Sequence, residues 1–153
     1  MAYATNADVS ARLGTFTLDG TTQPTTTEVD ALLAEKSGQL DAVMSSVGVT
    51  VPVTAPASFT VYLRGLEAAG ATADTLAIMF PDASGAGSID ETIAYWLGMW
   101  TTGLEMLKDG SAIPSGVTLS SAGLPSSYLT ANPDTELAIG TIAEPGITKG
   151  RVY

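Results

Sequence analysis

The sequence predicts an all-α fold, a small antiparallel helical bundle of one short and three long helices with an extended C-terminal arm. Three long segments repeat large apolar residues at steps of three and four, the spacing that places them on one stripe of a helix. Each segment begins near a helix-start signal and ends at glycine or proline. The alternation that starts at Val49 is interrupted by Pro52, which excludes a central strand there.

The short helix is expected between Thr5 and Gly14. Thr5 and Asp8 have the spacing of a capping box, in which each side chain bonds a backbone N–H that the first turn leaves unpaired. Val9 and Leu13 lie one turn apart, and Gly14 is a suitable stop. A helix of this length does not persist alone, so we expect it to dock on the rest of the bundle.

The second helix is predicted to begin after Thr25, which pairs with Glu28 as a capping box, and to end at Gly48. Glycine in a helix interior costs about 1 kcal/mol relative to alanine, so Ser37 and Gly38 indicate a point where another backbone crosses closely. The apolar stripe of this segment consists of Val29, Leu32, Leu33, Leu40, Val43, Met44 and Val47.

The third helix is expected to start at Pro56, a residue that suits a first helical turn, and to end before Pro81. Its middle is slim, with Gly65 and the run from Ala68 to Ala71, which favours burial against a bulky neighbour such as Trp96 or Trp100. Its apolar stripe consists of Phe59, Leu63, Leu66, Ala73, Leu76, Ala77 and Phe80.

The fourth helix is predicted from Ser88, which pairs with Glu91 as a start signal, to Gly110. It holds both tryptophans of the protein, and we expect them to belong to the core and not to a ligand platform. This stripe needs the other helices as partners, because isolated helices are marginal in water. The stripe consists of Ile89, Ile93, Trp96, Leu97, Trp100, Leu104 and Leu107.

The chain changes character after Gly110. Residues 1–110 are expected to form the bundle domain and residues 111–153 an extended C-terminal arm, which is rich in proline and glycine and has isolated apolar residues without a helical period. The segment 137–142 has some β character. Because the arm is too apolar for a solvated linker, we expect it to lie on another chain. Its predicted interaction residues are Leu137, Ile139, Ile142, Ile147, Arg151 and Tyr153.

Composition excludes several kinds of chemistry. The chain has no cysteine and no histidine, so zinc sites based on these residues, cysteine nucleophiles and Ser-His-Asp triads are absent. A net charge of −10 with six basic residues argues against a phosphate-gripping surface. No apolar run is long enough to span a membrane. We therefore predict no catalytic, cofactor or metal site, and no enzyme activity.

Two local motifs have simpler interpretations than catalysis. Gly85-Ala86-Gly87 lacks the third glycine and the Lys-Ser/Thr pair of a nucleotide loop, so it predicts a turn. The carboxylate pairs Asp90/Glu91 and Glu105/Asp109 lie near helix ends and off the apolar stripe. This position favours a solvated surface over acid–base chemistry.

The opening of the chain resembles a known family. Residues 3–14 read YATNADVSARLG, which is similar to the YAT-x-x-D-V-x-A-R-L-G opening of head-to-tail connector (adaptor) proteins of bacteriophages with long non-contractile tails. The following order is also similar: a threonine-rich connector, an acidic helix, a helix that starts near Phe59, and a tryptophan-bearing helix that closes at Gly110. The resemblance covers roughly residues 3–110.

The resemblance implies a structural role in the virion. Members of this family are small helical proteins that form a ring, usually of twelve copies, which joins the portal to the tail. The implied partners are further copies of the chain, the portal protein and the next tail-completion or tail-terminator protein. Double-stranded DNA would pass through without sequence-specific binding, and an acidic lining would repel its phosphates. We expect synthesis in the host cytoplasm, since residues 1–4 show no signal-peptide features.

Two alternatives remain open from the sequence. The first is a tail-completion or tail-terminator subunit of the virion, which should contain more strand. The second is a non-enzymatic helical protein-binding module. A DNA-binding version of such a module would need a basic helix, and the sequence contains none.

Overall fold

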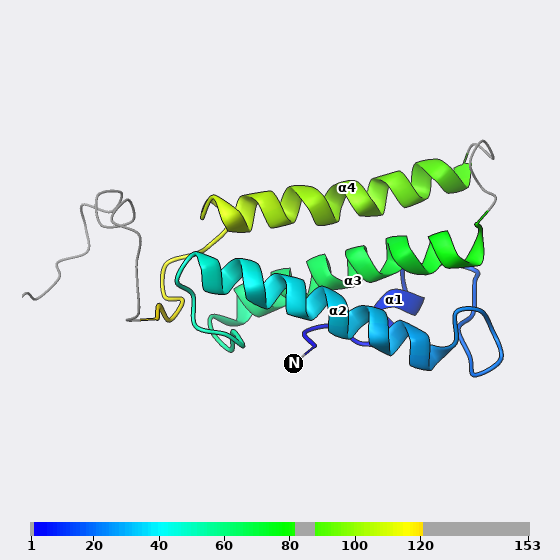
Figure 1. Ribbon diagram of the computed structural model, residues 1–153, viewed down its shortest axis with the longest axis horizontal. Coiled ribbons are helices and arrows are strands. Elements are labelled where there is room, and N and C mark those ends of the chain that lie inside the picture. Colours follow the sequence, from blue (N-terminus) through cyan, green and yellow to red (C-terminus); the bar gives the residue numbers. More distant parts are fainter. Residues whose placement is uncertain (1, 82–87, 121–153) are drawn as a thin grey trace, which may run out of the picture.

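The computed structural model describes residues 2–81 and 88–120, and in this part the protein is an all-α bundle. The elements follow the order α1 (Asn6–Ser10), α2 (Thr26–Ser46), α3 (Ala57–Met79) and α4 (Ser88–Lys108). The three long helices lie side by side, with α3 between α2 and α4, and α1 packs against α3 and α2 (Figure 1). None of the helices in these residues has the length and apolar character needed to cross a membrane.

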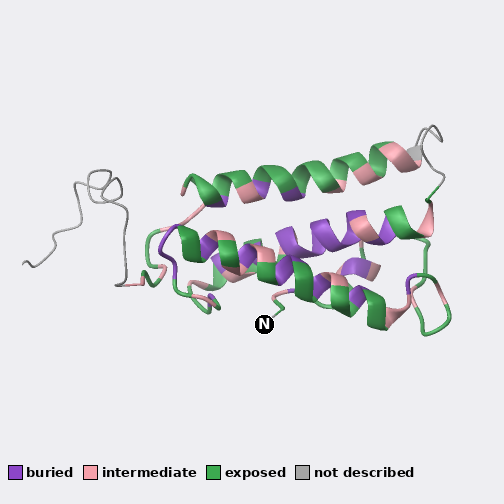
Figure 2. Ribbon diagram, in the orientation of Figure 1, coloured by how far each residue is buried: buried purple, intermediate pink, exposed green. Residues whose placement is uncertain are grey.

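Helix α3 is the central element of the bundle. Every residue from Glu67 to Ala73 is buried, a full turn and more with no solvent-facing side. This is possible because α1, α2 and α4 all contact α3, and because most of these residues are alanine, glycine or threonine, which allow close approach. Figure 2 shows the burial concentrated on α3, whereas α4 is exposed along its outward side.

The core consists of two clusters along α3. One surrounds Trp100 and Leu107 of α4 and includes Met44, Phe59 and Leu63 from the neighbouring helices. The other surrounds the α1 residue Val9, with partly buried side chains of α4 packed against its edge. The short helix α1 is therefore docked on the bundle, as expected for a helix of its length, because it buries an apolar side chain against the long helices.

Most predicted core residues lie inside this bundle. The buried ones are Val29, Leu33, Leu40, Phe59, Leu63, Leu66, Leu76, Trp100 and Leu107. The partly buried ones are Leu32, Ile93, Trp96 and Leu104. Leu97 is an error of the prediction, since its side chain is 44% exposed. It lies about 60° around the helix from Trp100, on the side away from Gly103, and α3 packs against the Gly103 side.

Glycines set the distance between α3 and α4. A Cβ atom at Gly70 would lie 2.8 Å from Cδ2 of Trp100, which is the close approach that the slim middle of α3 predicts. A second approach was not predicted from the sequence: a Cβ atom at Gly103 would overlap the Leu66 side chain. The two contacts are reciprocal, because each helix supplies one glycine and receives one large side chain.

Of the two residues predicted to mark a crossing, Ser37 is buried as expected, whereas the prediction is wrong for Gly38. Gly38 is exposed, and a Cβ atom added there would meet nothing within 4 Å. The buried positions are Lys36 and Ser37. Lys36 forms an ion pair with Asp74 at 2.7 Å and lies 5.4 Å from the centre of the Trp100 ring. The close contact at this crossing is therefore made by the long side chain of Lys36, and it does not depend on the absence of a side chain at Gly38.

The helix starts and the ends of the long helices follow the predicted signals, whereas α1 ends at Ser10, four residues before the predicted stop at Gly14. Thr25 and Glu28 bond each other's backbone N–H, and Thr5 and Asp8 also form a capping box. The predicted stop residues Gly48 and Gly110 have φ values of 81° and 80°, a left-handed conformation that glycine adopts without strain. Helix α4 begins at Ser88, although the capping bonds predicted there lie outside the described residues, as does the predicted turn at residues 82–87.

The start of the predicted arm packs on the bundle. Val49 and Leu119 form an isolated antiparallel bridge, flanked by hydrogen bonds from Thr50 N to Thr118 O (2.9 Å) and from Ser120 N to Gly48 O (2.6 Å). Ile113 and Val117 are partly buried against the first core cluster. Residues 111–120 of the predicted arm therefore belong to the packed bundle. The predicted β segment 137–142 and all six predicted interaction residues lie outside the described residues.

Candidate interaction surface

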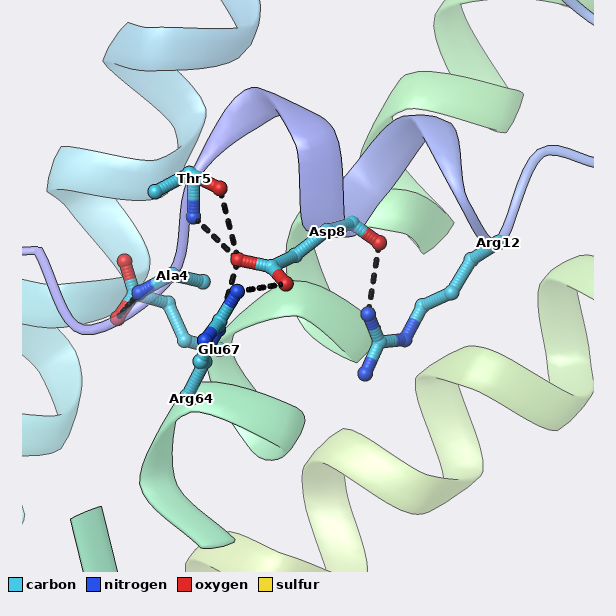
Figure 3. Close-up of polar contacts among 6 residues, drawn as sticks. All are labelled: Ala4, Thr5, Asp8, Arg12, Arg64 and Glu67. Atoms are coloured by element: carbon cyan, nitrogen blue, oxygen red, sulfur yellow. Dashed lines mark hydrogen bonds and ion pairs between the residues drawn. The ribbon is translucent and has the colours of Figure 1, made fainter. Parts of the chain in front are cut away.

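The residues that carry the resemblance form a polar network that holds α1 on α3. Asp8 Oδ2 accepts hydrogen bonds from the backbone N–H and the hydroxyl of Thr5, both at 2.8 Å (Figure 3). The same carboxylate receives two bonds from Arg64, from Nε at 2.9 Å and from Nη2 at 2.6 Å. Arg12 donates to the Asp8 carbonyl at 2.7 Å. The motif therefore specifies how the N-terminal helix docks.

The charge on Asp8 is strongly favoured by these contacts. Hydrogen bonds from Arg64, and further ones from Thr5, lower the pKa of Asp8 to about 2, against the opposing effect of partial burial. The side chain of Asp8 is largely covered, whereas that of Arg64 is half exposed. A bidentate pair of this geometry fixes orientation more than it adds free energy, because solvent screens the exposed partner.

The backbone segment that precedes α1 is also held in place by hydrogen bonds. Glu67 is fully buried on α3, and its Oε2 accepts from the backbone N–H groups of Tyr3 (2.7 Å) and Ala4 (3.2 Å). The Tyr3 hydroxyl donates to Asp41 at 2.7 Å and accepts from Val53 N at 3.0 Å. Tyr3 thereby connects α1 to α2 and to the segment before α3.

The burial of Glu67 has an electrostatic cost. Burial raises the pKa of Glu67 above its ordinary value of 4.5, and the two backbone N–H donors partly oppose this effect. The other carboxylate oxygen, Oε1, is buried without a hydrogen-bond partner. Polar contacts of this kind serve the fold, and they face the interior of the bundle.

The outer surface offers a different feature, an open groove of about 670 Å³ between α3 and α4. Its lining combines small residues with aromatic and methionine side chains. Tyr95 is 59% exposed and Met99 is 44% exposed, and a Cβ atom at Gly98 would meet nothing within 4 Å. The lining residues are Arg12, Tyr62, Gly65, Leu66, Ala94, Tyr95, Gly98, Met99, Thr102, Gly103 and Met106.

The groove is mainly apolar and has one charged group. Arg12 is the charged residue in its lining, and its guanidinium lies 5.8 Å from the centre of the Trp96 ring. Tyr62 stacks on Phe59 with ring centres 6.1 Å apart, which fixes one wall. Rigid aromatic walls, adaptable methionines and a single cation suit an apolar polypeptide segment with a nearby carboxylate.

Part of this groove could have been predicted from the spacing of residues on α4, although only the core stripe of that helix was predicted. Tyr95, Met99, Thr102 and Met106 are spaced by four, three and four residues, which defines a second stripe of α4 beside the tryptophan stripe. What could not be predicted is that α3 contributes Tyr62 and Gly65 opposite this stripe. In the described part of the chain, no cluster of three or more acidic residues has a geometry that could hold a metal ion.

Comparisons with protein-family models, with curated proteins and with solved structures found no match to this chain.

Proposed function

We propose that the protein is a structural subunit of a ring, of twelve copies by analogy with the family it resembles, that joins the portal of a phage head to the tail and extends the DNA channel. The observation that carries the proposal is the open apolar groove on a bundle whose N-terminal docking network uses the residues of the connector-like motif. The motif supports the family, and the groove supplies a surface for assembly.

The groove supports assembly because a helix with apolar residues on two sides needs two partners. Trp100 and Leu107 of α4 are buried against the bundle, while Tyr95 and Met99 face solvent. Exposed apolar patches of this kind are typical of protein interaction sites. A head-to-tail contact that closes on itself produces a ring.

The charge balance supports a channel that does not bind its cargo. At neutral pH the chain carries a net charge of −10, which disfavours tight contact with phosphates. A ring of such subunits lets DNA pass without sequence-specific binding. The proposed partners are further copies of the chain, the portal protein and the next tail-completion or tail-terminator ring, and the proposed location is the head–tail interface of the virion.

Electron microscopy of the purified protein mixed with portal-bearing, DNA-filled heads tests this role. We expect an additional annulus beneath the portal, present only when the protein is added. Binding at the free end of isolated tails instead would favour a tail-completion or tail-terminator subunit. If no annulus forms on either particle, the proposed function is wrong, and a helical protein-binding module outside the virion becomes the better account.

A further inference from the structure

We propose that the groove between α3 and α4 receives the segment 137–142 of a neighbouring copy of this chain. This inference rests on the proposed ring, since it specifies the contact that links one subunit to the next. The segment reads Leu-Ala-Ile-Gly-Thr-Ile and lies outside the described residues.

The dimensions of the groove match a short extended segment. Its lining on α4 runs from Ala94 to Met106, a rise of about 18 Å along the helix axis. Six residues in extended conformation span about 20 Å. Gly65 and Gly98 in the lining leave room for side chains that enter from outside.

The chemistry of the segment complements the lining. In an extended conformation Leu137 and Ile139 point to the same side, which provides two aliphatic anchors for the Tyr and Met walls. The segment is preceded by Glu136 and followed by Glu144, and the groove has Arg12 in its lining. One flanking carboxylate can therefore meet the single cation of an otherwise apolar site.

Charge favours the arm over the bundle surface of a second copy as the occupant. Residues 1–110 contain thirteen acidic and four basic side chains, so two bundle faces repel each other. Residues 111–153 contain three acidic and two basic side chains. The nearly neutral arm can approach a neighbouring bundle without this repulsion.

The length of chain is sufficient to reach a neighbour. The described structure ends at Ser120, whose backbone N–H donates a hydrogen bond to the carbonyl of Gly48, just after α2. Residues 121–136 can span up to about 50 Å when extended, whereas the 21 residues of α4 rise about 30 Å. The arm can therefore pass beyond its own bundle. Repetition of this contact in one sense around an axis links the subunits head to tail.

Disulfide cross-linking in the full-length protein tests the contact directly, because the chain has no cysteine of its own. The test variant combines Met99→Cys in the groove with Ile139→Cys in the arm. The matched control combines Leu97→Cys with Ile139→Cys, because Leu97 has the same 44% exposure as Met99 but lies about 160° around α4 from it. We expect a ladder of covalent oligomers from the test pair and not from the control pair.

Each other result of this cross-linking overturns the proposal. A monomeric product with an internal disulfide would show that the arm covers its own groove. Equal cross-linking of the test and control pairs would show random collision, and no cross-link at the highest soluble concentration would show that the segment does not visit the groove.

A second pair of variants fills the groove without touching the core. Gly98→Leu adds a side chain to the lining of the groove, and Gly38→Leu adds the same side chain to the exposed surface of α2; neither added Cβ atom meets an atom within 4 Å. We expect Gly98→Leu to weaken self-association by about tenfold or more while Gly38→Leu has no effect. Sedimentation analysis that finds equal association for both variants would contradict the proposal.

These outcomes are separable from a failure of the proposed function. If an annulus forms on portal-bearing heads but the test pair does not cross-link, the ring stands and this contact is wrong. If the test pair forms oligomers but no annulus appears on heads, the contact stands and the role at the head–tail interface is wrong.

Discussion

Helices α3 and α4 are both rich in apolar residues, yet the bundle treats them differently. Helix α3 is covered on all sides around residues 67–73, by α1, α2 and α4. Helix α4 is covered on one side, where Trp100 and Leu107 are buried, and its Tyr95–Met99 side is open. A helix that is apolar all round is normally buried. The middle of α3 is therefore fully covered within one chain, whereas the outward side of α4, together with Tyr62 of α3, is left open.

The largest loss of stability is expected at the contact between α3 and α4. The change Gly70→Leu forces a side chain into Trp100, whose Cδ2 atom lies 2.8 Å from the position of the first added carbon. We expect a loss of about 3 kcal/mol in the free energy of unfolding, since both helices must shift. Urea unfolding measures it, and Gly98→Leu on the open side serves as the control. Near-wild-type stability of Gly70→Leu would contradict the close contact.

An intermediate effect is expected where α1 covers α3. The change Asp8→Ala removes the carboxylate that caps α1 and receives two bonds from Arg64. We expect a loss of about 1 to 2 kcal/mol, the usual cost of losing a helix cap, with a small addition from the exposed ion pair. Thermal unfolding of Asp8→Ala beside Arg64→Ala separates the two contributions. If Arg64→Ala costs as much as Asp8→Ala, the cap is not the main term.

A smaller, pH-dependent effect is expected from the buried carboxyl of α3. Because burial raises the pKa of Glu67, the folded state holds its proton more tightly than the unfolded state. The resulting stability is present below 4.5, the ordinary pKa, and is lost as the pH rises through the raised value. We expect Glu67→Gln to lack this decline, so that the variant gains on the wild type between acidic and neutral pH in urea unfolding.

The contribution of Asp8 has the opposite sign and a different range. Its lowered pKa supplies stability above 3.8 that is lost as the pH falls through about 2. The two carboxyl groups therefore titrate in separate windows.

A stability difference between Glu67→Gln and wild type that does not change with pH would show that Glu67 is not perturbed by its burial.

The smallest effect on stability is expected on the open side of α4. Met99 is 44% exposed, so Met99→Ser in the isolated subunit should change the free energy of unfolding by less than about 0.5 kcal/mol. The same change should reduce assembly on portal-bearing heads, because it removes an apolar wall of the groove. A large loss of stability with normal assembly would indicate that Met99 serves the fold and not the interface.

The sequence predicted what depends on periodicity and local signals. The three apolar stripes, the capping boxes at Thr5 and Thr25 and the helix stops at Gly48 and Gly110 follow from spacing within one segment, and the helical bundle is confirmed. Gly70 was also predictable, because a slim helix implies a bulky neighbour.

What the sequence could not predict depends on the rotation of one helix against another. The exposure of Leu97 follows from the approach of Leu66 to Gly103, which no pattern within α4 reveals. The same holds for Gly38, which turns outward because Lys36 makes the crossing contact. The groove is lined by residues of two helices, such as Tyr62 and Met99. These residues can be identified in the sequence, but the sequence does not show that they lie opposite each other.

Cryo-microscopy of the assembled ring on the portal can show whether the open side of α4 is an assembly surface. We expect density from a neighbouring subunit between Tyr62, Tyr95 and Met99, continuous with the arm of that neighbour. A ring in which this groove faces solvent, or in which it is filled by the subunit's own arm, would contradict the account.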